Sequence, residues 1–205
     1  PMLYIGEEVG TKDGAAVDIA LDPLEGTTIC AKNLPNSLAV IAIAEKGSLL
    51  YAPDVYMEKV AIGPGYPPNT VKLDATPTEN VNAVAKAKGV EPHEITVCIL
   101  DRPRHAKLIE EVRGTGAAIR LIGDGDVAGI IHTTDPDETG IDLYLGIGGA
   151  PEGVLAAAAL RCIGGQMEGR LQLNTPEKIA RAAKMGITDP DKIYRMEEMA
   201  QGDVL

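Results

Sequence analysis

Residues 95–126, ITVCILDRPRHAKLIEEVRGTGAAIRLIGDGD, alternate between strand-like and helix-like patterns. ITVCILD and AAIRLIGDGD are short apolar runs typical of strands, and the segment between them, RPRHAKLIEEVRGTG, favours a helix. The alternation continues with a helix at VAGIIHTT, a strand at IDLYLGIGGA and a helix at PEGVLAAAALRCIGG. Repeated strand–helix units of this kind predict a layered α/β sheet with right-handed crossovers.

The first part of the chain, residues 1–92, is richer in strand patterns. Its apolar runs, broken by Gly, Asn and Pro, are MLYIGEEV, AVDIALD, SLAVIAIA and GSLLYAPDVYMEKVAIG. The EKG at 45–47 separates two of these runs and predicts a hairpin, while Thr78 and Gly89 predict the N-cap and C-cap of a helix. We therefore expect a strand-rich first sheet in residues 1–92 and an α/β second half in residues 93–205.

Composition and charge disfavour several classes of function. Apolar residues make up 45% of the 205 residues and the formal net charge is −11, which indicates a globular protein without the basic surface that nonspecific nucleic-acid binding requires. No apolar run reaches the roughly 18 residues of a membrane-spanning helix, and no signal-peptide pattern is visible, so we expect a cytoplasmic protein with no membrane partner. The three cysteines, Cys30, Cys98 and Cys162, form no CxxC pair, and their apolar surroundings predict buried free thiols.

The stretch DPLEGTT (22–28) places two carboxylates at the end of a predicted strand. Asp22 and Glu25 supply the hard oxygen ligands that Mg²⁺ and Mn²⁺ prefer. Gly26 permits close approach of the backbone to an anion, and Thr27 or Thr28 can donate to phosphate oxygens. The alternative is an ordinary type I turn with proline at its second position. The stretch alone leaves both interpretations open.

Three further strand ends carry polar residues where ligands of layered α/β sheets bind. In GIGGAPEG (146–153), Glu152 begins an alanine-rich helix, which suits either a phosphate site or plain helix capping, and GIGG lacks the spacing of a phosphate loop. In DRPRH, Arg102 and Arg104 can clamp a phosphate or begin a solvated helix. In GDGD, Asp124 and Asp126 can accept hydrogen bonds from sugar hydroxyls or form a turn.

The aromatic and histidine residues give weaker signals. Tyr56 in DVYMEK lies between apolar neighbours, a pattern that also fits a buried core tyrosine. His93, His105 and His132 have no mutual spacing typical of metal ligands, so we interpret them as surface or core residues. No serine lies in a GxSxG setting, which disfavours a serine hydrolase.

The motifs PMLYIGEEVG, DPLEGTT, APDVYMEK, RPRH, DGDV, GIGGAPEG and KMGI, in this order, resemble the class II fructose-1,6-bisphosphatases. The resemblance includes the cyanobacterial-type fructose-1,6-/sedoheptulose-1,7-bisphosphatases and covers essentially the whole chain. The DPLEGTT motif alone would indicate only the wider superfamily of metal-dependent, lithium-sensitive sugar phosphatases, which includes inositol monophosphatases.

The resemblance implies a fold, a cofactor and a set of site residues. The implied fold is a layered α-β-α-β-α sandwich, and the implied cofactor is Mg²⁺ or Mn²⁺. Asp22, Glu25 and Glu152 would bind the metal and, with Thr27, form the catalytic set. The residues implied to contact substrate are Glu25, Gly26, Thr27, Tyr56, Arg102, Pro103, Arg104, Asp124, Gly125, Asp126 and Gly149. Family members are longer, with a GEGE-type acidic segment before the first motif, so we expect the chain to be a portion of a longer protein.

The expected activity is metal-dependent hydrolysis of the 1-phosphate of fructose 1,6-bisphosphate. The expected partner is a small-molecule sugar bisphosphate rather than nucleic acid or membrane, and the resemblance implies a homo-oligomer, a dimer or a tetramer. Two alternatives remain open. One is an inositol-phosphate or nucleotide 3′-phosphatase, and the other is a catalytically incomplete module that binds sugar phosphates.

Overall fold

The computed structural model describes residues 6–205, which form a larger and a smaller sheet. The larger sheet has six strands in the order β5-β4-β6-β3-β7-β8. Its strands are β3 (Tyr56–Ile62), β4 (Thr96–Leu100), β5 (Ala118–Ile122), β6 (Leu143–Gly149), β7 (Gln166–Leu171) and β8 (Ile193–Arg195). β4 pairs in parallel with β5 and β6, whereas β3 is antiparallel to β6 and β7, and β8 to β7. The sheet is therefore mixed, and β3 lies within it between β6 and β7.

The smaller sheet consists of the antiparallel strands β1 (Val17–Glu25) and β2 (Leu38–Glu45). The register shifts between Asp22, which lies opposite Val40, and Glu25, which lies opposite Leu38. An extra residue on one strand is typical of a β-bulge, a feature that re-aims side chains at the end of a strand. The short helix α1 (Thr27–Ala31) follows directly.

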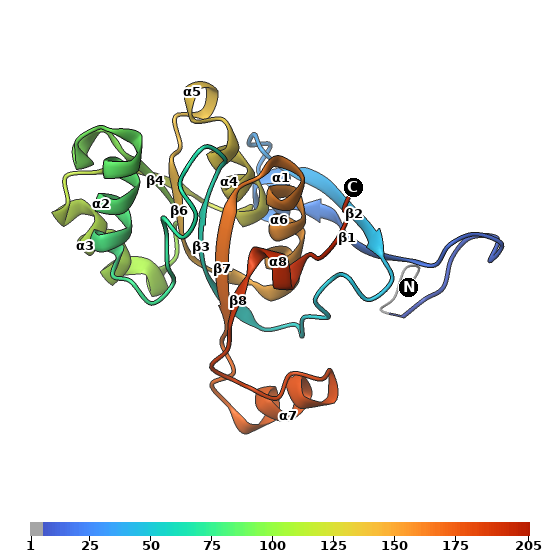
Figure 1. The fold of residues 1–205 in the computed structure, drawn as a ribbon. Helices are drawn as coiled ribbons and strands as arrows, with labels where there is room; N and C mark the ends of the chain where they lie inside the picture. The colour runs from blue at the N-terminus through green and yellow to red at the C-terminus, as the bar shows by residue number, and fades with distance from the viewer. Residues whose placement is uncertain (1–5) are drawn as a thin grey trace.

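Helices cover both faces of the larger sheet (Figure 1). On one side lie α2 (Pro77–Lys88) and α3 (Ala106–Gly114), and on the other lie α4 (Asp126–Ile131), α6 (Ala150–Ile163) and α8 (Met196–Met199). α6 also contacts β1 and β2, so the smaller sheet forms a further layer beyond the second set of helices. The remaining helical elements are η1 (Pro92–Glu94), η2 (Pro103–His105), η3 (His132–Thr134), α5 (Pro136–Thr139) and α7 (Pro176–Lys184).

The alternation of β3 side chains explains this layering. Met57 and Ala61 join the apolar cluster under α4, α6 and α8, while Val60 and Ile62 join the cluster under α2 and α3. Successive residues of a strand point to opposite faces, so a central strand can support two cores at once. Lys59, on the same face as Met57, is a buried charged residue within this apolar pattern.

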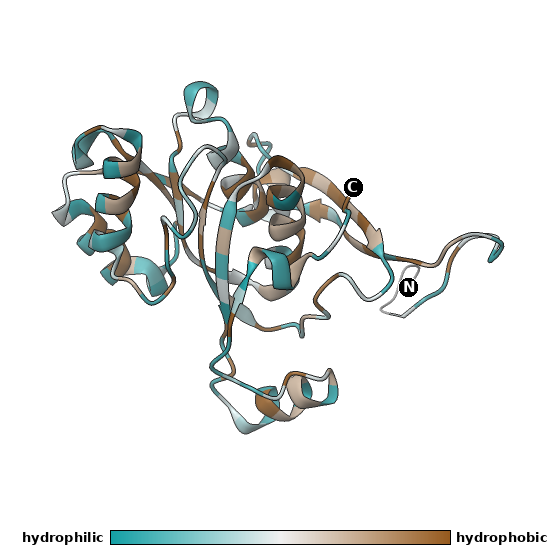
Figure 2. Cartoon of the chain, viewed as in Figure 1, coloured by the Kyte–Doolittle hydropathy of each residue, from teal (hydrophilic) through white to brown (hydrophobic). Residues whose placement is uncertain are grey.

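Strands β1 and β2 consist mostly of apolar residues (Figure 2). Ala42 is buried and belongs to the core on the α6 side, whereas Val17, Ile19 and Ile41 are 49%, 43% and 59% exposed. The antiparallel register places Ile19 and Ile41 on the face opposite Ala42.

The structure confirms the strand–helix alternation of residues 95–163 and the strand at SLAVIAIA. The hairpin prediction at 45–47 is wrong, because β2 pairs with β1 and the following Leu49 forms a bridge with Ala200. The strand expected at MLYIGEEV falls partly on residues 1–5, which lie outside the described residues, and residues 6–9 are not in a strand.

The predicted ends of α2 are half right. Gly89 is the C-cap, with a left-handed φ of 75°, as predicted. The N-cap is Thr76 rather than Thr78: the Thr76 hydroxyl accepts the N–H of Glu79, and the Glu79 carboxylate accepts the N–H of Thr76. This reciprocal pair is a capping box, and Pro77 occupies the first helical position.

Two other predictions concern the cysteines and the membrane. Cys98 is buried as predicted, but Cys30 and Cys162 are exposed, because the short helix α1 and the end of α6 leave them at the surface. Within residues 6–205, no helix combines the length and apolar character needed to cross a membrane.

Candidate active site

Glu25 is the most unusual carboxylate of the described residues. The bulge and the left-handed Gly26 (φ 80°) turn the chain at the end of β1, and the Glu25 residue is only 3% exposed. Its Oε1 accepts the N–H of Val127 at 3.1 Å, but its Oε2 is buried with no hydrogen-bond partner among residues 6–205. A Cβ at position 125 would lie 3.0 Å from Oε2, so Gly125 leaves room for this oxygen.

The environment of Glu25 is electrostatically unfavourable for a charge. Burial raises the pKa of Glu25 to about 7, from an ordinary value of 4.5. The N–H of Val127 opposes this shift, while the charges of Asp126, Asp22 and Asp124 add to it. A buried carboxylate surrounded by other carboxylates and carrying a free oxygen fits a site that receives a cation.

Glu152 lies in the first turn of α6 and shares the same surroundings. Burial is the largest cause of a raised pKa at Glu152, and the charges of Asp126 and Asp22 raise it further. The backbone N–H of Glu152 and the charge of Lys59 lower the pKa and partly offset this rise. A Cβ at position 149 would lie 1.9 Å from Glu152 Oε2, so only glycine at 149 leaves the carboxylate where it is. Asp22 and Asp126 thus act electrostatically on both Glu25 and Glu152.

Asp124 connects α1 to the RPRH segment. Its Oδ2 accepts the N–H of Thr28 at 3.0 Å, and its Oδ1 pairs with Arg102 Nη2 at 3.4 Å. Arg102 also donates to the carbonyl of Gly123. Arg102 therefore binds the GDGD turn, and the same turn contacts α1 through Asp124.

Arg104 and Tyr56 form a second group at the end of β3. Arg104 donates from Nε and Nη2 to the carbonyl of Ile147, at 3.1 and 2.7 Å, and its guanidinium lies 4.7 Å above the Tyr56 ring. Tyr56 is 48% exposed, so the interpretation as a core tyrosine is wrong. Its register partner on β6 is Gly149, which places the pair beside the start of α6.

Two predicted residues have simpler positions. Thr27 is exposed at the first position of α1, and Pro103 begins η2. Asp22 accepts the N–H of Leu24 at 3.0 Å through Oδ1, which fits a turn as well as a ligand.

The donor set fits a hard divalent cation in its chemistry and in the free oxygen of Glu25. The donors do not, however, form a complete metal site: within residues 6–205, no three His, Cys, Asp or Glu side chains lie close enough together to hold a metal ion. The predicted ligands Asp22, Glu25 and Glu152 share one electrostatic environment without forming a complete coordination shell.

Residues 1–205 match the family described as bacterial fructose-1,6-bisphosphatase, glpX-encoded. The chain belongs to this fructose-1,6-bisphosphatase family. It is 44% identical to proteins named D-fructose 1,6-bisphosphatase class 2/sedoheptulose 1,7-bisphosphatase from Synechococcus sp. (strain CC9311), Synechococcus sp. (strain CC9902) and Parasynechococcus marenigrum (strain WH8102). Each match covers 99% of this chain and 64% of the relative, so the chain spans less than two thirds of the length of these bisphosphatases.

Two buried residues beside the candidate site were not predicted from the sequence. His105 is 1% exposed, with Nδ1 2.7 Å from the Leu100 carbonyl and Nε2 accepting the N–H of Ile147 at 2.8 Å. Burial lowers the pKa of His105, and these partners fix a neutral ring with the proton on Nδ1. His105 is therefore a core histidine, one of the two positions predicted for it. No pattern in the sequence indicated that it anchors the end of β6.

The second missed residue is Lys59. It is 1% exposed and forms an ion pair with Asp126, which is 5% exposed. The only available signal was a lysine inside the apolar strand pattern MEKVAI, which is also typical of a strand with one solvated position.

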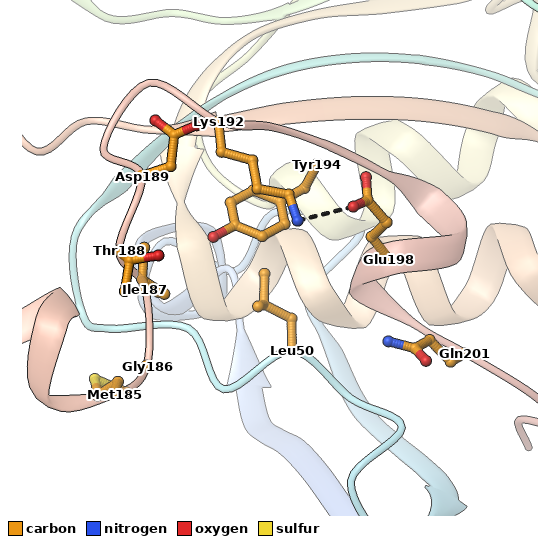
Figure 3. A pocket seen from close by; sticks show the side chains of 10 residues that line it. All are labelled: Leu50, Met185, Gly186, Ile187, Thr188, Asp189, Lys192, Tyr194, Glu198 and Gln201. Carbon is orange, nitrogen blue, oxygen red and sulfur yellow. Dashed lines mark ion pairs between the residues drawn. The ribbon is translucent and has the colours of Figure 1, made fainter.

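A cavity of about 320 Å³ lies elsewhere, beside β8 and α8 (Figure 3). Lys192 extends over the Tyr194 ring and pairs with Glu198 at 2.8 Å. None of the predicted site residues lines this cavity. Its lining residues are Leu50, Met185, Gly186, Ile187, Thr188, Asp189, Lys192, Tyr194, Glu198 and Gln201.

Proposed function

We propose that the protein hydrolyses the 1-phosphate of fructose 1,6-bisphosphate, with a divalent metal, to fructose 6-phosphate and phosphate. Family membership supports this assignment, and one observation carries it at the level of the site. Glu25, buried among carboxylates, has one oxygen that no donor in the described part of the chain reaches. Burying such an oxygen is costly unless a ligand satisfies it, and functional sites are where such costs are tolerated.

In this proposal Asp22, Glu25 and Glu152 bind Mg²⁺ or Mn²⁺. The metal, when bound, supplies Lewis-acid polarisation of the phosphoryl group and a lowered pKa of the attacking water. The Val127 N–H holds Glu25 in place through Oε1, so that Oε2 stays directed at the site. Completing the shell requires the carboxylates to turn toward one ion or to be joined by further ligands.

The other predicted residues would bind and orient the substrate. The backbone at Gly26 and the hydroxyl of Thr27 would contact the phosphate that is transferred. Arg104, fixed over Tyr56, keeps Nη1 available for the distal phosphate.

The GDGD turn and the start of α6 would complete the substrate contacts. Asp124, Gly125, Asp126 and Gly149 would line the sugar. Arg102 and Pro103 would support this wall rather than clamp a phosphate, because Arg102 is paired with Asp124.

The finer fold type and the setting of the protein belong to the same proposal. The α-β-α-β order of layers in residues 6–205 supports a sandwich of the lithium-sensitive sugar phosphatase type. Following the family resemblance, we place the protein in the cytoplasm as a homo-oligomer, a dimer or a tetramer.

A substrate panel tests the activity. The intact protein should release phosphate fastest from fructose 1,6-bisphosphate, and much more slowly from inositol 1-phosphate or a nucleotide 3′-phosphate, in the presence of Mg²⁺ or Mn²⁺. Glu25→Gln should reduce this rate by several orders of magnitude, because it removes a charged metal ligand. Glu168→Gln is the matched control, since Glu168 also accepts a backbone N–H, from Leu73, at a different place in the fold. Near wild-type phosphate release by Glu25→Gln would refute the assignment.

The carboxylates of residues 6–205 do not form a complete metal shell, which favours a second candidate, a module that binds sugar phosphates without hydrolysing them. Calorimetry distinguishes the two. Binding of fructose 1,6-bisphosphate without metal-dependent release of phosphate would support the module and exclude the enzyme.

A further inference from the structure

Lys59 and Asp126 form a buried ion pair beneath the proposed site. The side chain of Lys59 is 0% exposed and that of Asp126 is 7% exposed. A charge removed from water in this way is tolerated only with a partner of opposite sign, so the two side chains depend on each other. Lys59 lies on the central strand β3, and Asp126 begins α4.

Two glycines of the GIGGAPEG motif make the space for this pair. A Cβ at position 148 would lie 3.2 Å from Lys59 Nζ and 2.0 Å from Asp126 Oδ2. A Cβ at position 153 would lie 3.3 Å from Lys59 Cε. The lysine therefore occupies a narrow slot between β6 and α6, where its ammonium has little freedom to move.

The pair connects the core to the carboxylates of the site. Asp126 bonds to Lys59 through Oδ2, and no donor among residues 6–205 bonds to its Oδ1. The residue after it, Val127, donates its N–H to Glu25. A shift of Asp126 would therefore move both a potential hydroxyl acceptor and the amide that holds Glu25.

We propose that Lys59 is a positioning residue that fixes Asp126 through Oδ2, so that Oδ1 faces a hydroxyl of the sugar phosphate and the Val127 amide stays against Glu25. This inference rests on the proposed function for its substrate. Because Lys59 already neutralises Asp126, Asp126 acts as a hydroxyl acceptor and not as a ligand of the metal.

A double-mutant cycle on the intact protein tests the coupling. Lys59→Met should raise the KM for fructose 1,6-bisphosphate about 10-fold or more, the size expected for losing a hydrogen bond to a charged group. Asp126→Asn should raise it similarly, and the double variant should be no worse than either single variant, because Lys59 acts through Asp126. An unchanged KM in Lys59→Met would overturn the proposal, as would effects that multiply in the double variant.

The cycle also guards against a folding defect. Lys59→Met leaves the Asp126 carboxylate buried without a partner, whereas the double variant carries no such charge. If Lys59 had a merely structural role, Lys59→Met would change kcat and stability but not KM. The double variant would then recover wild-type stability and would have the KM of Asp126→Asn. The matched control is Lys88→Met, because Lys88, at the end of α2, pairs with Asp142 at 2.6 Å and contacts none of the proposed site residues. The KM of this variant should stay at the wild-type value.

Hydrogen exchange provides a readout that does not need activity. The Val127 amide should exchange at least about 10-fold faster in Lys59→Met than in the wild type, in excess of any global change, and should be unaffected in Lys88→Met. If the wild type releases no phosphate from fructose 1,6-bisphosphate, the proposed function fails, yet exchange at Val127 still decides the role of Lys59. Equal protection of Val127 in Lys59→Met and the wild type would overturn it.

Discussion

Replacing Glu25 with glutamine should change how the stability of the metal-free protein depends on pH. The pKa of Glu25 is raised from 4.5 to about 7 in the folded state. A carboxyl group with a raised folded pKa favours folding while it is protonated, so its contribution is complete below pH 4.5 and is lost as the pH rises to about 7. The wild type should therefore lose the stability contributed by the Glu25 carboxyl as the pH rises from 4.5 to about 7. Glu25→Gln lacks this carboxyl and should not show that loss.

The magnitude follows from the size of the shift. Each tenfold change in proton affinity is worth about 1.4 kcal/mol, so the rise from 4.5 to about 7 corresponds to about 3 kcal/mol. Partial screening by solvent reduces this, and we expect about 2 kcal/mol. The glutamine amide does not titrate, so any change in stability caused by its hydrogen bonds is the same at every pH. The substitution therefore shifts the whole pH profile without changing the difference in slope between wild type and variant.

Urea unfolding with a chelator present measures the effect. Between about pH 5 and about pH 8, the free energy of unfolding should fall about 2 kcal/mol more in the wild type than in Glu25→Gln. Glu168→Gln, which removes a carboxylate bonded to the Leu73 amide, should keep the wild-type slope. Parallel pH profiles for the wild type and Glu25→Gln would show that the pKa of Glu25 is not raised in the folded state.

Two further predictions concern the metal and helix α2. Adding Mg²⁺ or Mn²⁺ to the metal-free protein at pH 8, at 100 times the dissociation constant, should stabilise the wild type by about 2.7 kcal/mol and raise its unfolding temperature. Glu25→Gln should respond far less, and equal temperature shifts in the two proteins would contradict the ligand assignment. Thr76→Ala should reduce the free energy of unfolding by about 1 kcal/mol, because it breaks the capping box, while Thr78→Ala should reduce it by less than about 0.5 kcal/mol. Equal reductions for the two variants in urea unfolding would refute Thr76 as the N-cap.

Local patterns predicted β3 to β6 of the larger sheet because their cause is local, whereas β7 and β8 were not predicted. Strands β4 and β6 are buried runs, and α6 is an alanine-rich segment that ends at a glycine, so the period of the sequence determines each element. The hairpin at 45–47 failed because its outcome depends on a distant contact, the bridge between Leu49 and Ala200. The capping error is different: glutamate three residues after Thr76 is a local signal that indicates the correct threonine.

The candidate site divides in the same way. The carboxylates at the strand ends were predictable, because polar residues after an apolar run stand out from the pattern. Lys59 and His105 were not, since a lysine in a strand or a histidine at a helix start is usually solvated. Only the packing of α4 and α6 against β3 buries Lys59, and only the proximity of Leu100 and Ile147 fixes both nitrogens of His105.

The glycines of GIGGAPEG show how one motif can have a function other than the one its composition suggests. A glycine-rich strand end before a helix suggests a phosphate loop, but Gly148 and Gly149 face carboxylates: a Cβ at either position would come within 2.0 Å of Asp126 Oδ2 or 1.9 Å of Glu152 Oε2. These contacts are with the movable ends of side chains, so a larger residue would displace the carboxylates rather than unfold the chain. At Gly63 the corresponding contact is 2.1 Å from the backbone carbonyl of Thr133, which cannot give way, and that glycine serves packing. The requirement for glycine at 148 and 149 therefore comes from the geometry of the acidic site, and the motif is better understood as space for carboxylates than as a cradle for phosphate.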